Sequence, residues 1–560
     1  MPRSQFLYSV VVLCVAAVTP FVVLDGRHTV LYEAALLAIM LAMLVTSAVR
    51  SRSQQGRNAI QSLAFLAIPA CSSLLIAGIF YPGFMSYDSL HALRSARNGV
   101  VDSAWPPMVS YVWRVVEMFS SDPSAMHVAQ VFLLTSSVNA IIFMYSKSLL
   151  TCVLFQAVYL SVPVVLGTVA VIWKDVLMAA FFVAAFACVL RLRRAREHRV
   201  ALSTIASVLL FLGVCSRHNA ITGAVPLVVY LVYGNIESMN VRGWSRWGWL
   251  CATSVLLIAG MYVAKRGLDR YSMPGLRRLA GMEHVGRGCK AMDLAGASVF
   301  LQKNLLQQLN PAIDAQDIRQ NYDARHSNLS PIMQRIPFDE RLDRAWLESW
   351  RRYPVAMCYN KFLLATHLVG AHRGQQFYVT DPGIVENEYG FHLQDSPIRD
   401  AVVAYVVRAC EWTVVRPWFI YVVAWSLLVP VLACHVMSLE LFLLHSSALL
   451  YLVGLILYGN AADARLAFYA TTATLLAGFV SVTSLYPCVR WPQRWQGRWF
   501  GSWRPAGKAG ESITDASLGG DRMPSAADGK RGLRNLGGTV RDFDATVSRE
   551  PLVPPFSSPS

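Results

Sequence analysis

About twelve long apolar runs constrain this chain more than any other feature. A membrane-spanning helix needs roughly 20 mostly apolar residues, because its backbone groups must be hydrogen-bonded within the helix once water is excluded. The runs are approximately 6–24, 29–49, 59–80, 126–145, 149–171, 176–190, 200–215, 219–235, 247–264, 417–436, 440–458 and 467–486. With 55% hydrophobic and only 15% charged residues over 560 positions, the chain is predicted to be an all-α integral membrane protein.

The spacing of the runs divides the chain into four parts. Residues 1–264 carry transmembrane helices and a first large loop at 81–125, and residues 265–416 are too polar to lie in lipid and are expected to form a mixed external subdomain. Residues 417–486 return to the membrane, and residues 487–560 are basic and then rich in Gly, Ser, Asp and Pro, which predicts a disordered tail. No convincing small-residue cleavage site follows the first run, so we interpret it as a retained helix rather than a signal peptide.

Charge in the short loops predicts the orientation. Lys and Arg accumulate on the cytoplasmic side of membrane proteins, and the basic loops follow the even-numbered runs: VRSRSQQGRN, YSKS, RLRRAREHRV and NVRGWSRW. The segment VRWPQRWQGRWFGSWRPAGK after the last run is basic and aromatic, as expected beside an anionic inner leaflet. Both termini are therefore predicted to be cytoplasmic, and the net charge of +16 is interpreted as orientation information rather than as a nucleic-acid-binding surface.

The loops after the odd-numbered runs then share the opposite side, and they contain the polar motifs of the chain. These are the loop with Asp88 and DSAWPP, then WKD at 173–175, SRHN at 216–219, the long polar segment, and NAADAR at 460–465. One assignment of sides thus collects all of these motifs on the external face. This coincidence is the main physical indication of an external functional site.

The sequence allows two interpretations of Asp88. An acid fixed at the mouth of a cavity can deprotonate a hydroxyl or help to hold a divalent cation such as Mg²⁺ or Mn²⁺. The surrounding SYDS equally suits the capping of a helix N-terminus. In the same loop, Asp102 and Trp105 are candidates to contact an acceptor or a sugar, although Trp at this position is also typical of the interfacial aromatic belt.

Cations next to apolar runs form the second candidate group. Arg gives a bidentate fork and Lys a point charge, and both are suited to phosphate. Lys174, Arg217, His218 and Arg465 are therefore candidates to bind a phosphate. Asp175 is a candidate sugar contact, although Lys174 and Asp175 can also be a plain ion pair at a helix end.

A phosphate site at the rim of a membrane fits a lipid phosphate, whose charge stays at the surface while its chain lies in the bilayer. A polyprenyl-phosphate sugar has this form. Transfer of its sugar needs a base for the acceptor hydroxyl and cations for the departing phosphate.

The order of several short motifs resembles a family. YPGFMSYDS, DSAWPPMVSYVW, WKDVLMA, SRHNAI, DLAGAS, WLESWRRYPVAMCYNKF and DARLAFY, spread over roughly residues 75–470, resemble landmarks of a bacterial branch of the C-fold (GT-C) membrane glycosyltransferases. That superfamily includes the protein O-mannosyltransferases and the lipid A aminoarabinose transferases. The resemblance implies an inverting glycosyltransferase with Asp88 as the catalytic acid/base and with Lys174, Arg217 and Arg465 near the donor phosphate.

The resemblance also implies a setting and partners. It implies a bacterial inner membrane, a periplasmic active site, a polyprenyl-phosphate sugar donor and a glycan, lipid or protein acceptor of the cell envelope. The chain departs from the family in two places, because Ser89 stands where a second acid is usual, which weakens the case for a metal, and Leu466 follows Arg465 where Tyr is usual. No particular sugar or acceptor follows from it.

Three other functions stay open as alternatives. A transporter or flippase for a lipid-linked or anionic solute would place charges along a path at mid-depth, and a glycan polymerase or ligase would also combine many spans with external Arg residues. A membrane scaffold explains the topology but not the clustering of charges. Separately, Cys289 and Cys358 are both in the polar segment and can form a disulfide if that segment is in an oxidising compartment.

Overall fold

A computed structural model of the chain describes residues 54–99, 106–194, 198–237, 244–271, 281–322, 332, 335–337, 339–372, 379–459 and 462–486. The side chains at 54–61, 270–271 and 281–285 are outside this description. The chain divides into two compact units, Met1–Arg490 and Trp491–Ser560. The predicted runs 6–24 and 29–49 and the predicted disordered tail lie outside the described residues, so the fold below is that of the first unit.

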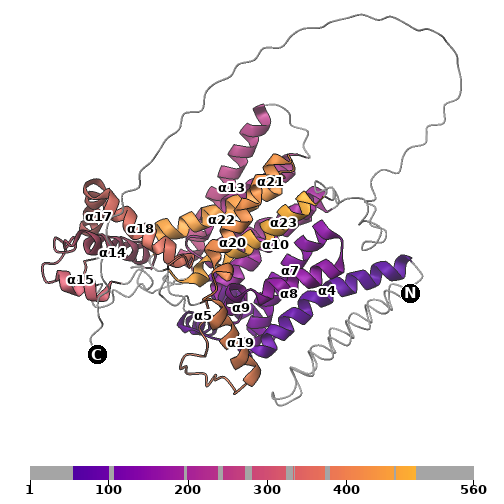
Figure 1. Ribbon diagram of the computed structural model, residues 1–560, viewed down its shortest axis with the longest axis horizontal. Helices are drawn as coiled ribbons and strands as arrows, with labels where there is room; N and C mark the ends of the chain where they lie inside the picture. Colours follow the sequence, from indigo (N-terminus) through magenta and orange to yellow (C-terminus); the bar gives the residue numbers. More distant parts are fainter. Residues whose placement is uncertain are drawn as a thin grey trace, which may run out of the picture. The chain divides into compact units, whose positions relative to one another are not determined.

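The described residues form helices and no β-strand (Figure 1). Their bounds are α4 (Gln54–Ile79), α5 (Tyr87–Asn98), α6 (Met108–Glu117), α7 (Pro123–Ser146), α8 (Leu149–Ser161), α9 (Pro163–Val169), α10 (Lys174–Arg194), α11 (Arg199–Ser216), α12 (Ala220–Ile236), α13 (Trp244–Tyr271), α14 (Gly281–Leu301), α15 (Ala315–Asn321), α17 (Glu340–Arg352), α18 (Pro354–Leu368), α19 (Pro397–Ala409), α20 (Pro417–Ser426), α21 (Leu428–Ala433), α22 (Leu439–Tyr458) and α23 (Phe468–Leu485). Two short 3₁₀ helices, η1 (Thr413–Val415) and η2 (Ala464–Ala467), precede α20 and α23.

Seven of the described helices are long and apolar enough to cross a membrane, which supports a helical integral membrane protein. The predicted runs between residues 59 and 486 all coincide with helices, but one of them is bent and two form helical segments shorter than 18 residues. α8 and α9 meet at an angle of 81°, with Pro163 at the start of α9, where it lacks the N–H that would continue α8. α12 and the α20–α21 pair are shorter than 18 residues.

α10 is the most deeply buried of these spans. It packs against α7, α11, α12 and α23, and 89% of its apolar window is inside the protein. Close approach is possible because the neighbours present small residues: a Cβ on Gly213 of α11 would lie 2.4 Å from the Phe182 ring of α10. Since α10 begins at Lys174, this packing fixes the position of one candidate site residue.

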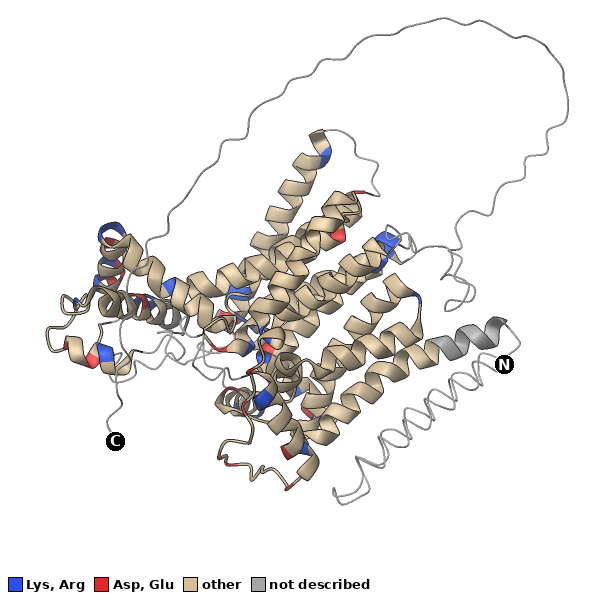
Figure 2. Ribbon diagram, viewed as in Figure 1, with Lys and Arg blue, Asp and Glu red and all other residues tan. Residues whose placement is uncertain are grey.

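Charged residues are sparse along the bundle helices and frequent on α14, α15 and α17 (Figure 2). These three helices and the start of α18 surround a hydrophobic core of their own, which runs from Ala291 to Met357 and is separate from the main core. α19 and the later part of α18 belong to the main core instead. The predicted external segment 265–416 therefore contributes to two cores.

Two landmark motifs of the sequence meet in that second core. Asp293 of DLAGAS is 3% exposed, and its carboxylate lies 2.9 Å from Lys361 Nζ. It accepts hydrogen bonds from Asn360 Nδ2 (2.8 Å) and Trp346 Nε1 (3.0 Å). These contacts connect α14 with α17 and α18 inside the second core.

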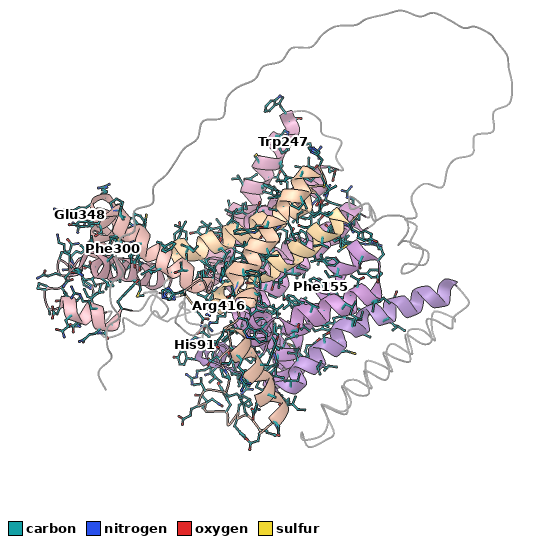
Figure 3. All side chains as sticks on the ribbon, in the orientation of Figure 1. His91, Phe155, Trp247, Phe300, Glu348 and Arg416 are labelled. Carbon is teal, nitrogen blue, oxygen red and sulfur yellow. The ribbon has the colours of Figure 1, made fainter. Side chains whose placement is uncertain are left out.

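Arg416, labelled in Figure 3, ties the end of α18 to the start of α20. Its guanidinium donates to the carbonyl groups of Gly370 and His372, each at 3.1 Å, and to that of Cys410 at 3.2 Å. Before α19, Glu388 forms an ion pair with Arg94 of α5 (2.6 Å), the helix that carries the labelled His91 (Figure 3). Residues 383–391 therefore lie against the segment that leads into α5 and against α5 itself.

Candidate functional site

The short segment before α5 is the structural centre of the candidate site. Phe84 N donates to Ala170 O (3.1 Å) and Ile172 N donates to Phe84 O (3.0 Å), so the chain entering α5 runs beside the chain entering α10. Gly83 has a φ of 108° and lies against Ile172 and His127, a conformation and a space that suit glycine. Asp88 and Lys174 are thereby brought together from distant parts of the sequence.

Ser86, and not Asp88, occupies the N-cap position of α5. The Ser86 backbone N–H donates to Ser89 Oγ (3.2 Å), and Ser89 Oγ donates to the carbonyl of Ile172 (2.7 Å). Asp88 is in the first turn, where the helix dipole favours a negative charge. The capping interpretation of SYDS therefore applies to the serines, and the Asp88 carboxylate faces two cations.

Both cations contact the same oxygen of Asp88. Lys174 Nζ lies 3.1 Å from Asp88 Oδ2, and Arg465 Nη2 lies 3.2 Å from that oxygen. The three side chains are 17–20% exposed, so they are partly enclosed but reachable. Charge-assisted hydrogen bonds of this kind are stronger than neutral ones.

Arg465 is held by two further groups. Its Nε lies 2.6 Å from Asp463 Oδ2, and Asp463 Oδ1 also accepts from the Arg465 backbone N–H (3.1 Å) as the cap of η2. The guanidinium lies over the ring of Trp173, 4.6 Å from its centre. Sequence reasoning did not select Trp173 or Ser86 individually, although WKD and SYDS contain them.

Arg217 completes the group of cations. It forms an ion pair with Asp175, and both Arg217 and Arg465 act electrostatically on Lys174. Asp175 has no exposed surface (0%). The predicted role of Asp175 as a sugar contact does not fit this burial. Its carboxylate instead forms the ion pair with Arg217.

The other predicted residues are placed as follows. His218 is half-buried in the turn between α11 and α12, next to Arg217. Asp102 and Trp105 lie outside the described residues, and the structure begins again at Pro106, shortly before α6. The disulfide between Cys289 and Cys358, which the sequence left open, is absent: both thiols are free, Cys289 buried and Cys358 exposed.

Asp381 is the acid that sequence reasoning missed. It is exposed and interacts electrostatically with Arg465, Asp463 and Asp88. Displacement of water by the surrounding protein raises the pKa of its carboxyl; Arg465 opposes this rise, whereas Asp463 and Asp88 add to it. The sequence around Asp381, VTDPG, indicates only a turn. No neighbouring motif connects Asp381 with Asp88.

Two cavities lie near the segment that leads into α5, and the smaller one adjoins the site. A small one of about 20 Å³ is lined by Asp88, Lys174, Ser110 and Ile172 among others, and a space of this size holds about one water molecule or one hydroxyl group. A larger one of about 510 Å³ lies between α19 and the loop at Pro382 and Gly383. Phe84, which precedes α5, is among the residues that line the larger cavity, whereas Asp88, Lys174 and Arg465 are not.

A divalent cation at Asp88 does not fit this arrangement. Two positive groups contact the Asp88 oxygen that a metal would need, and such neighbours repel a further cation. Within the described residues, no group of three His, Cys, Asp or Glu side chains is arranged to hold a metal ion. Lys174 and Arg465 are instead suited to bind another anion in place of the Asp88 carboxylate.

Comparison with known proteins identified no relative of this chain. No protein family, no curated protein and no solved structure matches the chain.

Proposed function

We propose that this protein is a membrane glycosyltransferase that moves a sugar from a polyprenyl-phosphate donor to an acceptor of the cell envelope. In this proposal the chain crosses a bacterial inner membrane about twelve times, both termini are cytoplasmic, and the site opens to the periplasm. The acceptor is a glycan, a lipid or a protein. The transfer inverts the configuration of the sugar, as the family resemblance of the motifs implies.

One observation carries the proposal: Lys174 and Arg465 converge on a single oxygen of Asp88. This oxygen occupies the position in which a phosphate oxygen would meet the same two cations. Arg217 stands beside them, and the group is located where α10 enters the apolar bundle. A lipid phosphate, with its charge at the rim and its chain in the bilayer, matches this placement.

The mechanism follows from competition between two anions. When the donor phosphate contacts Lys174 and Arg465, it replaces the Asp88 carboxylate as their partner. The same cations then stabilise the negative charge that the phosphate gains as the bond from its oxygen to the sugar C1 breaks. The acceptor oxygen forms the new bond to C1, and its proton passes to a carboxylate, for which Asp88 is the residue predicted from the sequence.

The position of charge in the described helices favours this function over a transporter. Inside the bundle Tyr159 contacts Thr472 (3.0 Å) and Tyr421 contacts Thr471 (2.9 Å), all neutral groups, and the buried ion pair of Lys265 with Asp269 lies near the end of α13. The ion pairs of α10 are at its two ends, with Lys174 and Asp175 at one end and Arg193 at the other. A path for an anion would need charge between them. A glycan polymerase or ligase remains the nearest alternative in chemistry.

The test uses the full-length protein in lipid and a panel of radiolabelled polyprenyl-phosphate sugars. Wild type is expected to release or transfer one of these sugars, and Asp88→Asn is expected to lose about 100-fold or more of that turnover. Glu388→Gln, which removes an exposed acid paired with Arg94 of α5, serves as the control and is expected to keep it. Wild type that turns over no member of the panel but moves labelled lipid or anion across the membrane would identify a transporter instead.

A further inference from the structure

The larger of the two cavities, of about 510 Å³, is bounded by one face of α19 and by the segments around Phe84 and Gly383. Such a volume is in the range of ligand-binding cavities. Most of the α19 residues that line it recur at a spacing of three or four, which places them on one side of the helix: Asp400, Val403, Ala404, Val407 and Arg408. The cavity is therefore a groove that follows α19.

Two arginines give this groove its charge. Arg399 is 8% exposed; its Nη1 donates to Gln394 O (2.5 Å), and its Nε lies 3.4 Å from Asp400 Oδ1. Within the described residues, Arg399 Nη2 and the guanidinium of Arg408 have no hydrogen bond or ion pair. Because Asp400 is the one acid of the lining, the groove carries one net positive charge.

The rest of the lining is apolar. Val403, Ala404 and Val407 lie between the two arginines, which are about 13 Å apart along the helix axis. No side chain of Asn, Gln, Ser, Thr, Tyr or Trp lines the groove, so it lacks the amide and hydroxyl groups that would hold a neutral sugar. The lining suits a molecule that has one anionic group and an apolar part.

α19 lies against helices of the apolar bundle. It packs on α9, and Tyr405 Oη donates to Ser161 O (2.8 Å) at the end of α8. Its exposed side chains include Ile398 (50%) and Tyr405 (39%), and the chain that follows it exposes Trp412 (55%) and Val414 (59%). Exposed apolar and aromatic side chains beside transmembrane helices are typical of the membrane interface. Lipid is therefore the nearest source of an amphiphilic anion.

We propose that this groove binds an anionic bilayer phospholipid. Arg399 Nη2 donates to the phosphodiester oxygens, for which Arg is well suited, and an acyl chain lies over the apolar residues and the aliphatic stem of Arg408. A phosphodiester has one negative charge, which matches the net charge of the lining. A phosphate monoester such as polyprenyl phosphate has up to about two and is better matched by Lys174, Arg217 and Arg465. The inference goes beyond the proposed function and does not depend on it, because lipid binding needs no turnover.

The experiment counts the lipids bound to the full-length protein by native mass spectrometry, during titration with phosphatidylglycerol, which is anionic, or phosphatidylcholine, which is zwitterionic. Arg399→Gln and Arg408→Gln each remove a positive charge, Asp400→Asn removes the opposing acid, and Val403→Trp fills the groove without a change of charge. Arg341→Gln is the matched control, because this arginine is 57% exposed on α17 and does not line the groove. Inorganic phosphate and polyprenyl phosphate are added as competitors, and the unfolding temperature of each variant confirms that it is folded.

We expect wild type to bind one phosphatidylglycerol about tenfold more tightly than phosphatidylcholine. Arg399→Gln should weaken this binding about tenfold, since it removes a hydrogen bond to a charged group, and Arg408→Gln about two- to threefold. Asp400→Asn should strengthen it about two- to fivefold, an opposite change that a folding defect would not produce. Val403→Trp should abolish it, and Arg341→Gln should bind as wild type does.

Four results would overturn the inference. Equal affinities of wild type for the two phospholipids would show that the groove does not select for charge. Unchanged phosphatidylglycerol binding in Arg399→Gln combined with Arg408→Gln would place the lipid elsewhere. Displacement of phosphatidylglycerol by inorganic phosphate would make the groove a site for free anions, and its displacement by a lower concentration of polyprenyl phosphate would make the groove a second site for the donor lipid. Sugar turnover by wild type tests the proposed function separately and leaves this inference unaffected.

Discussion

The guanidinium of Arg465 stacks on Trp173, with its central carbon 4.6 Å from the centre of the ring. The Trp173 Nε1–H in turn donates to Ser86 Oγ (2.8 Å), the residue that caps α5. The entry to α10, the cap of α5 and the short helix η2 therefore meet at one aromatic ring. Arg465 approaches Asp88 in the orientation that this ring allows.

Removal of the Trp173 ring should weaken the binding of a lipid phosphate. A cation–π contact at a partly enclosed site contributes about 1–2 kcal/mol, so Trp173→Ala should raise the dissociation constant of polyprenyl phosphate about tenfold. Trp173→Phe keeps an aromatic face and should have the smaller effect. Equilibrium binding of radiolabelled polyprenyl phosphate in nanodiscs measures both, and equal affinity of Trp173→Ala and wild type would contradict the role of the stack.

The ion pair between Asp175 and Arg217 should matter for stability as well as for the site. Asp175 is fully buried, so Asp175→Asn leaves the Arg217 charge without its partner and should lower the free energy of unfolding by about 3–5 kcal/mol. The exposed pair of Arg94 and Glu388 is the comparison, and Glu388→Gln should leave the unfolding midpoint unchanged. Denaturant unfolding in detergent, followed by tryptophan fluorescence, checks both. Equal midpoints for the two variants would show that burial does not set the effect.

Asp293 gives a dependence of stability on pH. Burial raises the pKa of the Asp293 carboxyl above its ordinary value of 3.8, against the opposing effect of Lys361. As pH falls through this raised pKa, the folded protein takes up a proton that the unfolded chain does not yet bind, so the contribution of Asp293 to stability increases. The increase ends near the ordinary value.

The measurement compares the unfolding temperatures of wild type and Asp293→Asn between pH 7 and pH 4. Because Asn does not titrate, the difference between wild type and the variant should shift in favour of wild type as the pH is lowered. A shift in favour of the variant would mean that the pairing of Asp293 with Lys361, and not burial, dominates the pKa.

Cysteine labelling tests the separation of Cys289 and Cys358. Cys289 is buried, its Sγ lies 3.0 Å from Tyr458 O, and burial raises the pKa of its thiol to about 11, so little reactive thiolate is present at neutral pH. Cys358 is exposed. In variants that retain one of the two, a maleimide should modify Cys358 rapidly and Cys289 only after denaturation. In the wild-type chain, which contains both cysteines, failure of Cys358 to react until a reductant is added would support a disulfide between them.

The helical membrane architecture could be read from the sequence because it depends on local composition. An apolar run in lipid must satisfy its own backbone, so its length and hydropathy predict a helix wherever it lies in the fold. The sequence did not reveal the sharp turn between α8 and α9, since hydropathy continues through it, whereas the run 219–235 already had the length of α12. It also did not reveal that α18 divides its contacts between two cores.

The sequence by itself predicted which motifs share a side of the membrane, and this prediction made Asp88, Lys174, Arg217 and Arg465 candidates. Such a prediction needs only the positions of Lys and Arg along the chain. Only the tertiary structure decided the pairings: Ser86 as the cap, Asp175 as a buried partner, and Asp381 as a neighbour of Arg465. Electrostatic energy depends on distance in space, and packing against α9 and η2 brings these charges together from segments far apart in the chain.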